Sequence, residues 1–127
     1  MIRRVLVILI SVVFCAGGLT ASAKMLIRDF KGTGTATTAE FEVRAPWILD
    51  WRVNSDYQGS LAIEIALVDA NTGFQSGMIV RTKRPGNGIR LFNKGGKFRL
   101  RVSSTLTRWQ LKVEQLTAAE AELYTPR

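Results

Sequence analysis

Two alternating runs of side chains lie in the stretch KFRLRVSSTLTRWQLKVEQ, residues 97–115. Apolar residues recur at every second position, first at Phe98, Leu100 and Val102 and then at Trp109, Leu111 and Val113. Successive side chains of a β-strand point to opposite faces, so period-two alternation is typical of a half-buried strand. The stretch predicts two antiparallel strands joined through Ser103–Thr107 as a hairpin, with one apolar face and one basic face.

The same pattern extends outward from this stretch. Five further runs are predicted to be strands: Phe41–Val43, Trp47–Val53, Leu61–Leu67, Met78–Lys83 and Ile89–Phe92. Segments rich in glycine, proline and asparagine separate the runs, and Pro85–Gly88 and Asn93–Gly96 are predicted to form tight hairpin turns. Short strands at near-regular spacing, with no long helix between them, indicate an all-β fold. We expect a single antiparallel β-sandwich of about seven strands.

One short helix is predicted near the C-terminus. Thr117 followed by Glu120 fits a capping box, in which each side chain satisfies a backbone N–H of the first helical turn. Pro126 is expected to stop the helix after about two turns, which is too short to be stable alone in water.

The first 23 residues have the anatomy of a secretory signal peptide. Arg3 and Arg4 precede an apolar run, and Ala21-Ser22-Ala23 supplies the small-residue cleavage pattern. The domain is then residues 24–127, exported to the periplasm or secreted. The alternative is an uncleaved N-terminal membrane anchor, but Val5–Leu19 has only 15 residues, fewer than the ~20 that span a bilayer.

Composition excludes several kinds of chemistry. The chain has 127 residues, enough for one domain, with no histidine and a single cysteine, Cys15, inside the predicted signal peptide. A Ser-His-Asp or Cys-His nucleophile system therefore cannot be assembled, and a His/Cys zinc site cannot either. The sequence implies no metal and no cofactor.

Charge is distributed unevenly along the chain. The formal net charge is +8, and the segment from Ala70 to Val113 holds ten basic residues and no acidic one. The candidate anion-binding residues are Lys97, Arg99, Arg101, Arg108, Lys112 and Arg90. In the predicted hairpin the first five share one face, where like charges opposite each other destabilise a sheet. Either internal acids such as Glu42 and Glu120 neutralise this face, or an anionic partner does.

Four stretches of the sequence form a recognisable set: Thr37–Val43, Pro46–Trp51, Lys97–Val102 and Trp109–Gln115. In these stretches the chain resembles a diffuse group of small secreted or lipid-anchored bacterial β-sandwich domains of uncharacterised function. The resemblance implies a fold and a compartment but no reaction. This chain departs from the acidic or neutral character of such domains because it is strongly basic.

These observations lead to an expected function. We expect an exported, non-catalytic binding module whose cationic sheet face takes anionic lipid, glycan or acidic protein of the cell envelope. One alternative is a structural accessory protein with an internally neutralised basic face. Another is a small hydrolase using carboxylates such as Asp50 and Glu64. Nucleic acid is disfavoured by export. Trp47, Trp51 and Trp109 are in phase with aliphatic residues, so we expect them in the core rather than on a ligand platform.

Overall fold

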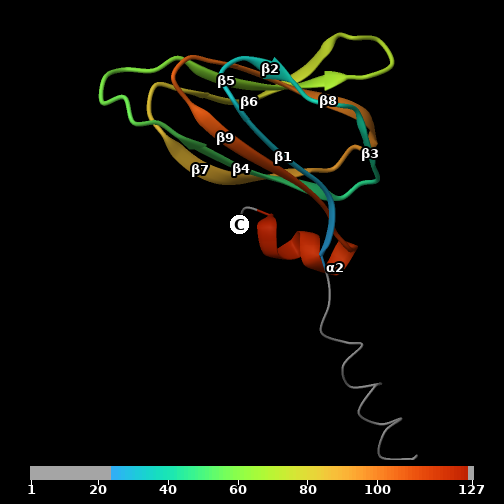
Figure 1. Cartoon of the computed structure of the whole chain (residues 1–127). Helices are drawn as coiled ribbons and strands as arrows, with labels where there is room; N and C mark the ends of the chain where they lie inside the picture. The colour runs from blue at the N-terminus through green and yellow to red at the C-terminus, as the bar shows by residue number, and fades with distance from the viewer. Residues whose placement is uncertain (1–23, 126–127) are drawn as a thin grey trace, which may run out of the picture.

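Two antiparallel sheets face each other in the computed structural model, which describes residues 24–125 (Figure 1). Sheet A contains four strands in the order β1-β9-β4-β7. Sheet B contains β2-β8-β5-β6, with β3 also paired to β8. The strands are β1 (Met25–Thr33), β2 (Ala36–Thr37), β3 (Phe41–Val43), β4 (Trp47–Asn54), β5 (Ile63–Asp69), β6 (Gln75–Thr82), β7 (Gly86–Phe92), β8 (Gly96–Ser104) and β9 (Arg108–Gln115).

The hydrophobic core lies between the two sheets. Trp47 of β4 is fully buried, and its ring stacks on Phe92 of sheet A at 4.2 Å between centroids and lies 5.8 Å from Phe98 of sheet B. Trp109 is also buried, as predicted. Trp51 packs against the same core but is only half-buried, so the prediction of full burial is wrong for this residue.

All seven predicted strands are confirmed, and residues 24–125 contain two more, β1 and β2. The count of about seven is therefore corrected to nine for this part of the chain. Strand β1 escapes the period-two pattern because its register shifts between Leu26 and Arg28. A β-bulge of this kind adds a residue to one strand, so the core-packed side chains Ile27 and Phe30 fall three positions apart instead of two.

The predicted hairpin of residues 97–115 does not form. Strand β8 pairs with β5, β2 and β3 in sheet B, whereas β9 pairs with β1 and β4 in sheet A. The connection therefore crosses from one sheet to the other, and Leu106 within it has a positive φ of 58°. The segments Pro85–Gly88 and Asn93–Gly96 do not form hairpin turns either. Strand β7 lies in sheet A, whereas β6 before it and β8 after it lie in sheet B, so both connections cross between the sheets. Gly86–Gly88 belongs to β7 itself.

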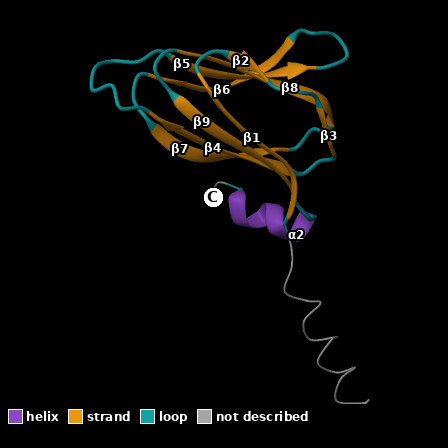
Figure 2. Ribbon diagram, viewed as in Figure 1, coloured by secondary structure: helices purple, strands orange, loops and turns teal. Residues whose placement is uncertain are grey.

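The predicted C-terminal helix is confirmed as α2 (Ala118–Ala121), continued by a 3₁₀ turn, η1 (Glu122–Tyr124). Both hydrogen bonds of the capping box between Thr117 and Glu120 are present. Figure 2 shows the helix below sheet A, at the end where the described chain begins. Ile48 of β4 points away from the core by alternation and is still fully buried.

The proposed signal peptide, its anchor alternative and Pro126 lie outside the described residues. Within residues 24–125, no helix combines the length and apolar character needed to cross a membrane.

Candidate functional site

The basic residues predicted from the sequence are distributed over three surfaces rather than one. Lys97, Arg99 and Arg101 alternate with the buried residues of β8 and point outward from sheet B. Arg108 and Lys112 point outward from sheet A, on the opposite side of the molecule. The prediction of a single shared face is therefore wrong, because the chain changes sheets between β8 and β9.

The cations on the outer face of sheet B have acceptors within the domain. Arg101 donates to Oε1 of Gln75 at 2.7 Å, and Arg99 donates to the backbone carbonyl of Thr38 at 3.3 Å. Lys97 lies directly across from Glu42 in the sheet register. Glu120, which we considered as a neutralising acid, is instead engaged with the backbone N–H of Thr117 at 2.8 Å. The cations on the outer face of sheet B therefore lie next to polar groups of the same sheet and its connections.

Arg90 occupies a sheet edge. It lies opposite the core residue Leu49 in the register of β7 and β4, so its Cβ is on the face of sheet A that is turned toward the core. Its guanidinium donates to the carbonyls of Met78 and Ile79 on β6 at 3.2 and 3.4 Å. It also lies over the ring of Phe92, 5.8 Å from the centroid. Arg90 thus links the edges of the two sheets.

Lys112 lies between two carboxylates on the outer face of sheet A. The register places it across from Asp29 of β1 on one side and Asp50 of β4 on the other. Opposite charges at adjacent cross-strand positions attract each other. Of the predicted cations, this leaves Arg108 next to an open part of the surface.

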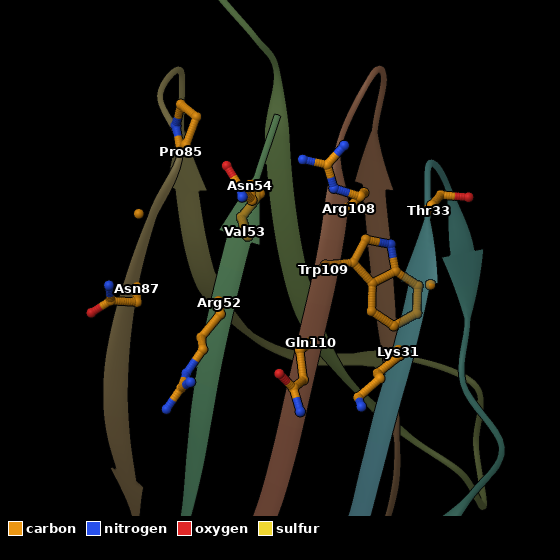
Figure 3. A pocket seen from close by; sticks show the side chains of 12 residues that line it. Lys31, Thr33, Arg52, Val53, Asn54, Pro85, Asn87, Arg108, Trp109 and Gln110 are labelled. Atoms are coloured by element: carbon orange, nitrogen blue, oxygen red, sulfur yellow. The ribbon is translucent and has the colours of Figure 1, made fainter. Parts of the chain in front are cut away.

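A hollow of about 800 Å³ lies on the outer face of sheet A, at the end far from α2. Two rows of outward side chains line it, the first crossing all four strands and the second crossing β1, β9 and β4 and ending at Pro85, just before β7 (Figure 3). The first row is Lys31, Gln110, Arg52 and Asn87; the second is Thr33, Arg108, Asn54 and Pro85. The remaining lining residues, on the inward phase, are Gly32, Val53, Gly86 and Trp109. The hollow is therefore open to solvent. Most of its exposed lining is apolar and includes the aliphatic parts of these side chains, whose cationic, amide and hydroxyl groups are set among it.

The three cations of the hollow differ in their engagement. Arg108 forms a bidentate pair with Asp56 at 3.0 and 3.2 Å, and this hydrogen-bonded pair raises the pKa of Arg108 and lowers that of Asp56 below its usual 3.8. Arg52 lies 3.5 Å from a carboxylate oxygen of Asp50. Lys31 is exposed, and within residues 24–125 it has no carboxylate within ion-pair distance. Two of the three cations therefore have a carboxylate partner, and Lys31 is the one without a partner in the part of the chain that the structure describes.

The amides of the hollow add neutral hydrogen-bonding groups. Gln110 donates to both carboxylate oxygens of Asp29 at 3.0 and 3.2 Å, which fixes its orientation. Each amide offers an acceptor oxygen and a donor nitrogen. The oxygen of Asn54 already accepts from the backbone N–H of Ser55 at 2.9 Å, so Asn54 offers its nitrogen to a ligand hydroxyl, whereas Asn87 can act as donor or acceptor. Arginine and lysine donate to carboxylate, sulfate or phosphate oxygens. The arrangement is suited to binding a polar, anionic molecule.

The structure also bears on the alternative of a carboxylate hydrolase. Asp50 points outward from sheet A, whereas Glu64 points outward from sheet B and pairs with Arg81 at 3.1 Å. Two carboxylates on opposite faces cannot act on the same bond. Within the described residues, no group of three or more histidine, cysteine, aspartate or glutamate side chains is arranged to hold a metal ion.

Sequence reasoning found Arg108 but missed Lys31, Arg52 and the three amides of the hollow. Lys31 belongs to a strand that was not predicted, and the others are polar residues on three strands that only the register brings together. A partial signal was present, since Arg52 and Gln110 fall on the polar phase of predicted strands.

No protein-family model matches the chain, and no curated protein matches its sequence.

Proposed function

We propose that the protein is an exported, non-catalytic β-sandwich module that binds an anionic component of the cell envelope through the outer face of sheet A. The observation that carries this proposal is the hollow of about 800 Å³ lined by Lys31, Arg52 and Arg108. Export is inferred from the pattern of residues 1–23, and the sandwich arrangement from the shared core of the two sheets.

Two observations favour sheet A over sheet B: the hollow on its outer face, and the extent to which the cations of each sheet are already bonded to groups of the fold. Arg99 and Arg101 of sheet B are bonded to groups of the fold itself, so a ligand would have to displace those contacts. Lys31 has no such contact within residues 24–125, and the pair of Arg108 with Asp56 is solvent-exposed. The Arg52 side chain is 58% exposed, although its partner Asp50 is only 17% exposed. Exposed ion pairs contribute little to stability and are readily exchanged for a ligand.

A structural accessory role is the second candidate. The observation in its favour is the local pairing of cations across both faces, such as Arg81 with Glu64 and Lys112 between Asp29 and Asp50. In that case the basic residues serve the fold alone, and no anionic ligand binds.

Retention of the full chain on immobilised dextran sulfate, with neutral dextran as the control, tests the proposed function. We expect retention on the sulfated matrix only, and elution as salt shortens the Debye length to ~8 Å at physiological ionic strength. A triple variant of the hollow, Lys31→Gln, Arg52→Gln and Arg108→Gln, should lose retention. The matched triple on sheet B, Arg81→Gln, Lys97→Gln and Arg101→Gln, removes the same charge and should keep most of it. Equal loss in both would show that net charge, and not the hollow, is responsible.

A further inference from the structure

The first row of the hollow alternates cation and amide across four strands. Lys31, Gln110, Arg52 and Asn87 follow one another on β1, β9, β4 and β7 (Figure 3). Neighbouring strands are ~4.8 Å apart, so the backbone positions of the two cations are separated by roughly 10 Å. A ligand along this row meets positive charge at intervals, with a neutral hydrogen-bonding group beside each cation.

We propose that the ligand of the hollow is an acidic polysaccharide that lies across the strands of sheet A. This inference rests on the proposed function and names the class of its ligand. Carboxylates of the polymer pair with Lys31 and Arg52, while its hydroxyl groups bond to the amides of Gln110 and Asn87. A polyacid without hydroxyl groups can pair with the cations, and its carboxylates can accept from the amide nitrogens, as Asp29 does from Gln110. It has no hydroxyl group to donate to the amide oxygens, so it uses the amides less fully.

The pair between Arg108 and Asp56 shows how a carboxylate fits this surface. Asp56 places both carboxylate oxygens on the two terminal nitrogens of Arg108, which is the fork geometry that an acidic sugar would also use. The Asp56 side chain is 89% exposed. It can therefore leave Arg108 to the ligand at little cost, so it acts as an internal competitor.

Two other anionic partners fit the hollow less well. Single-stranded nucleic acid is bound by exposed aromatic rings on which the bases stack. The one aromatic lining residue is Trp109, which is only 7% exposed and donates its indole N–H to the carbonyl of Gly34 at 2.9 Å. A membrane surface is held by apolar side chains that insert between lipids. The outward rows of the hollow present cationic, amide and hydroxyl groups, with Pro85 as their apolar member.

Three probes of similar charge distinguish the ligand classes: polygalacturonate, poly-glutamate, and vesicles of phosphatidylglycerol. Titration of the full chain at low salt should give the tightest binding for polygalacturonate. The variant Lys31→Gln/Arg52→Gln should bind it about tenfold or more weakly, because charge-assisted hydrogen bonds are the stronger ones. The variant Asn54→Ala/Asn87→Ala should weaken polygalacturonate binding severalfold and poly-glutamate binding clearly less, because only the polysaccharide has hydroxyl groups that can donate to an amide oxygen. Lys97→Gln/Arg101→Gln, on sheet B, is the matched control and should bind like the unmodified protein.

The outcomes separate this inference from the proposed function. Binding of poly-glutamate or vesicles as tight as that of polygalacturonate would overturn the polysaccharide assignment and leave the anion-binding function standing. If Asn54→Ala/Asn87→Ala weakened the binding of polygalacturonate and of poly-glutamate equally, the polysaccharide assignment would be overturned as well. If no probe binds, the proposed function itself fails. If the control variant weakens binding as much as the hollow variant, the placement of the ligand on sheet A is wrong.

Discussion

The outer faces of the two sheets carry basic side chains in different surroundings. On sheet B, Arg99 and Arg101 lie across from Val68 and Ala66 of the central strand β5, which point outward and are only 6% and 3% exposed. The aliphatic stems of the arginines therefore shield apolar side chains, and their guanidinium groups bond to the fold. On sheet A, the side chains of the hollow line open space instead.

The difference shows that positive charge alone does not mark a binding surface. The candidate cations of β8 belong to the densest basic segment of the sequence, yet two of them have acceptors inside the domain. Lys31 and Arg52 come from the less basic half of the chain and line the hollow. The two outer faces differ in the shape of the surface and in whether the N–H donors of the cations are already bonded within the domain.

The largest expected effect concerns the core on which both faces depend. Trp47→Ala should lower the free energy of unfolding by about 3–5 kcal/mol, because it removes a fully buried ring and its contacts with Phe92 and Phe98. Trp51→Ala, at a half-buried position, should cost clearly less. Chemical denaturation measures both. A variant of Trp47 as stable as the unmodified protein would show that the two sheets do not share this core.

A smaller effect is expected beneath the hollow. A Cβ at Gly32 would lie 2.5 Å from Cζ2 of Trp109, a rigid ring that packs under sheet A. Gly32→Ala should therefore destabilise the protein by roughly 1–3 kcal/mol. Gly77→Ala is the control, because a Cβ there would meet no described heavy atom within 4 Å. Thermal melting of the two variants is the measurement, and equal melting temperatures would contradict the close packing at Gly32.

Matched arginine variants compare the two faces directly. Arg99→Ala removes the hydrogen bond to Thr38 and part of the cover of Val68, so it should cost about 1 kcal/mol of stability. Arg52→Ala, on the hollow, should change stability by less than ~0.5 kcal/mol. Urea denaturation can resolve this difference. If Arg52→Ala were the more damaging change, the division into a structural face and a binding face would be reversed.

The smallest expected effect depends on pH. Arg108 holds the pKa of Asp56 below 3.8, so the pair stabilises the folded protein above the ordinary pKa of an aspartate. That contribution is lost as the pH falls through the lowered pKa. Asp56→Asn should therefore lower the melting temperature slightly at pH 7, and the difference should vanish in more acidic solution. The same variant should bind polygalacturonate more tightly at pH 7, since the competitor of the ligand is gone.

Much of the fold follows from local patterns, because a strand buried on one face must alternate. Trp47, Leu49 and Val53 are predicted correctly from this rule, and the capping box of Thr117 and Glu120 follows from hydrogen bonding within one turn. The bulge near Leu26 breaks the alternation, so β1 is missed. The change of sheet after β8 is missed because strand pairing is decided by contacts distant in sequence.

The candidate site is less predictable than the fold for the same reason. Each side chain of the hollow is an ordinary polar residue on its own strand, and the hollow exists only where the register aligns four strands. Arg108 was predicted as a candidate from charge counting, but its partner Asp56 lies 52 positions away. Lys97, Arg99 and Arg101 were selected by the same counting and lie on the other sheet.

The crossing of the chain between β8 and β9 also determines how the protein meets a charged surface. Because the basic segment supplies both outer faces and the β7 edge, attraction toward a polyanion comes from several sides and does not strongly orient the approaching molecule. Long-range attraction then raises the rate of encounter, while the choice of face falls to short-range hydrogen bonds. Substitutions outside the hollow should accordingly alter how fast a ligand associates, and substitutions within it how long the ligand remains bound.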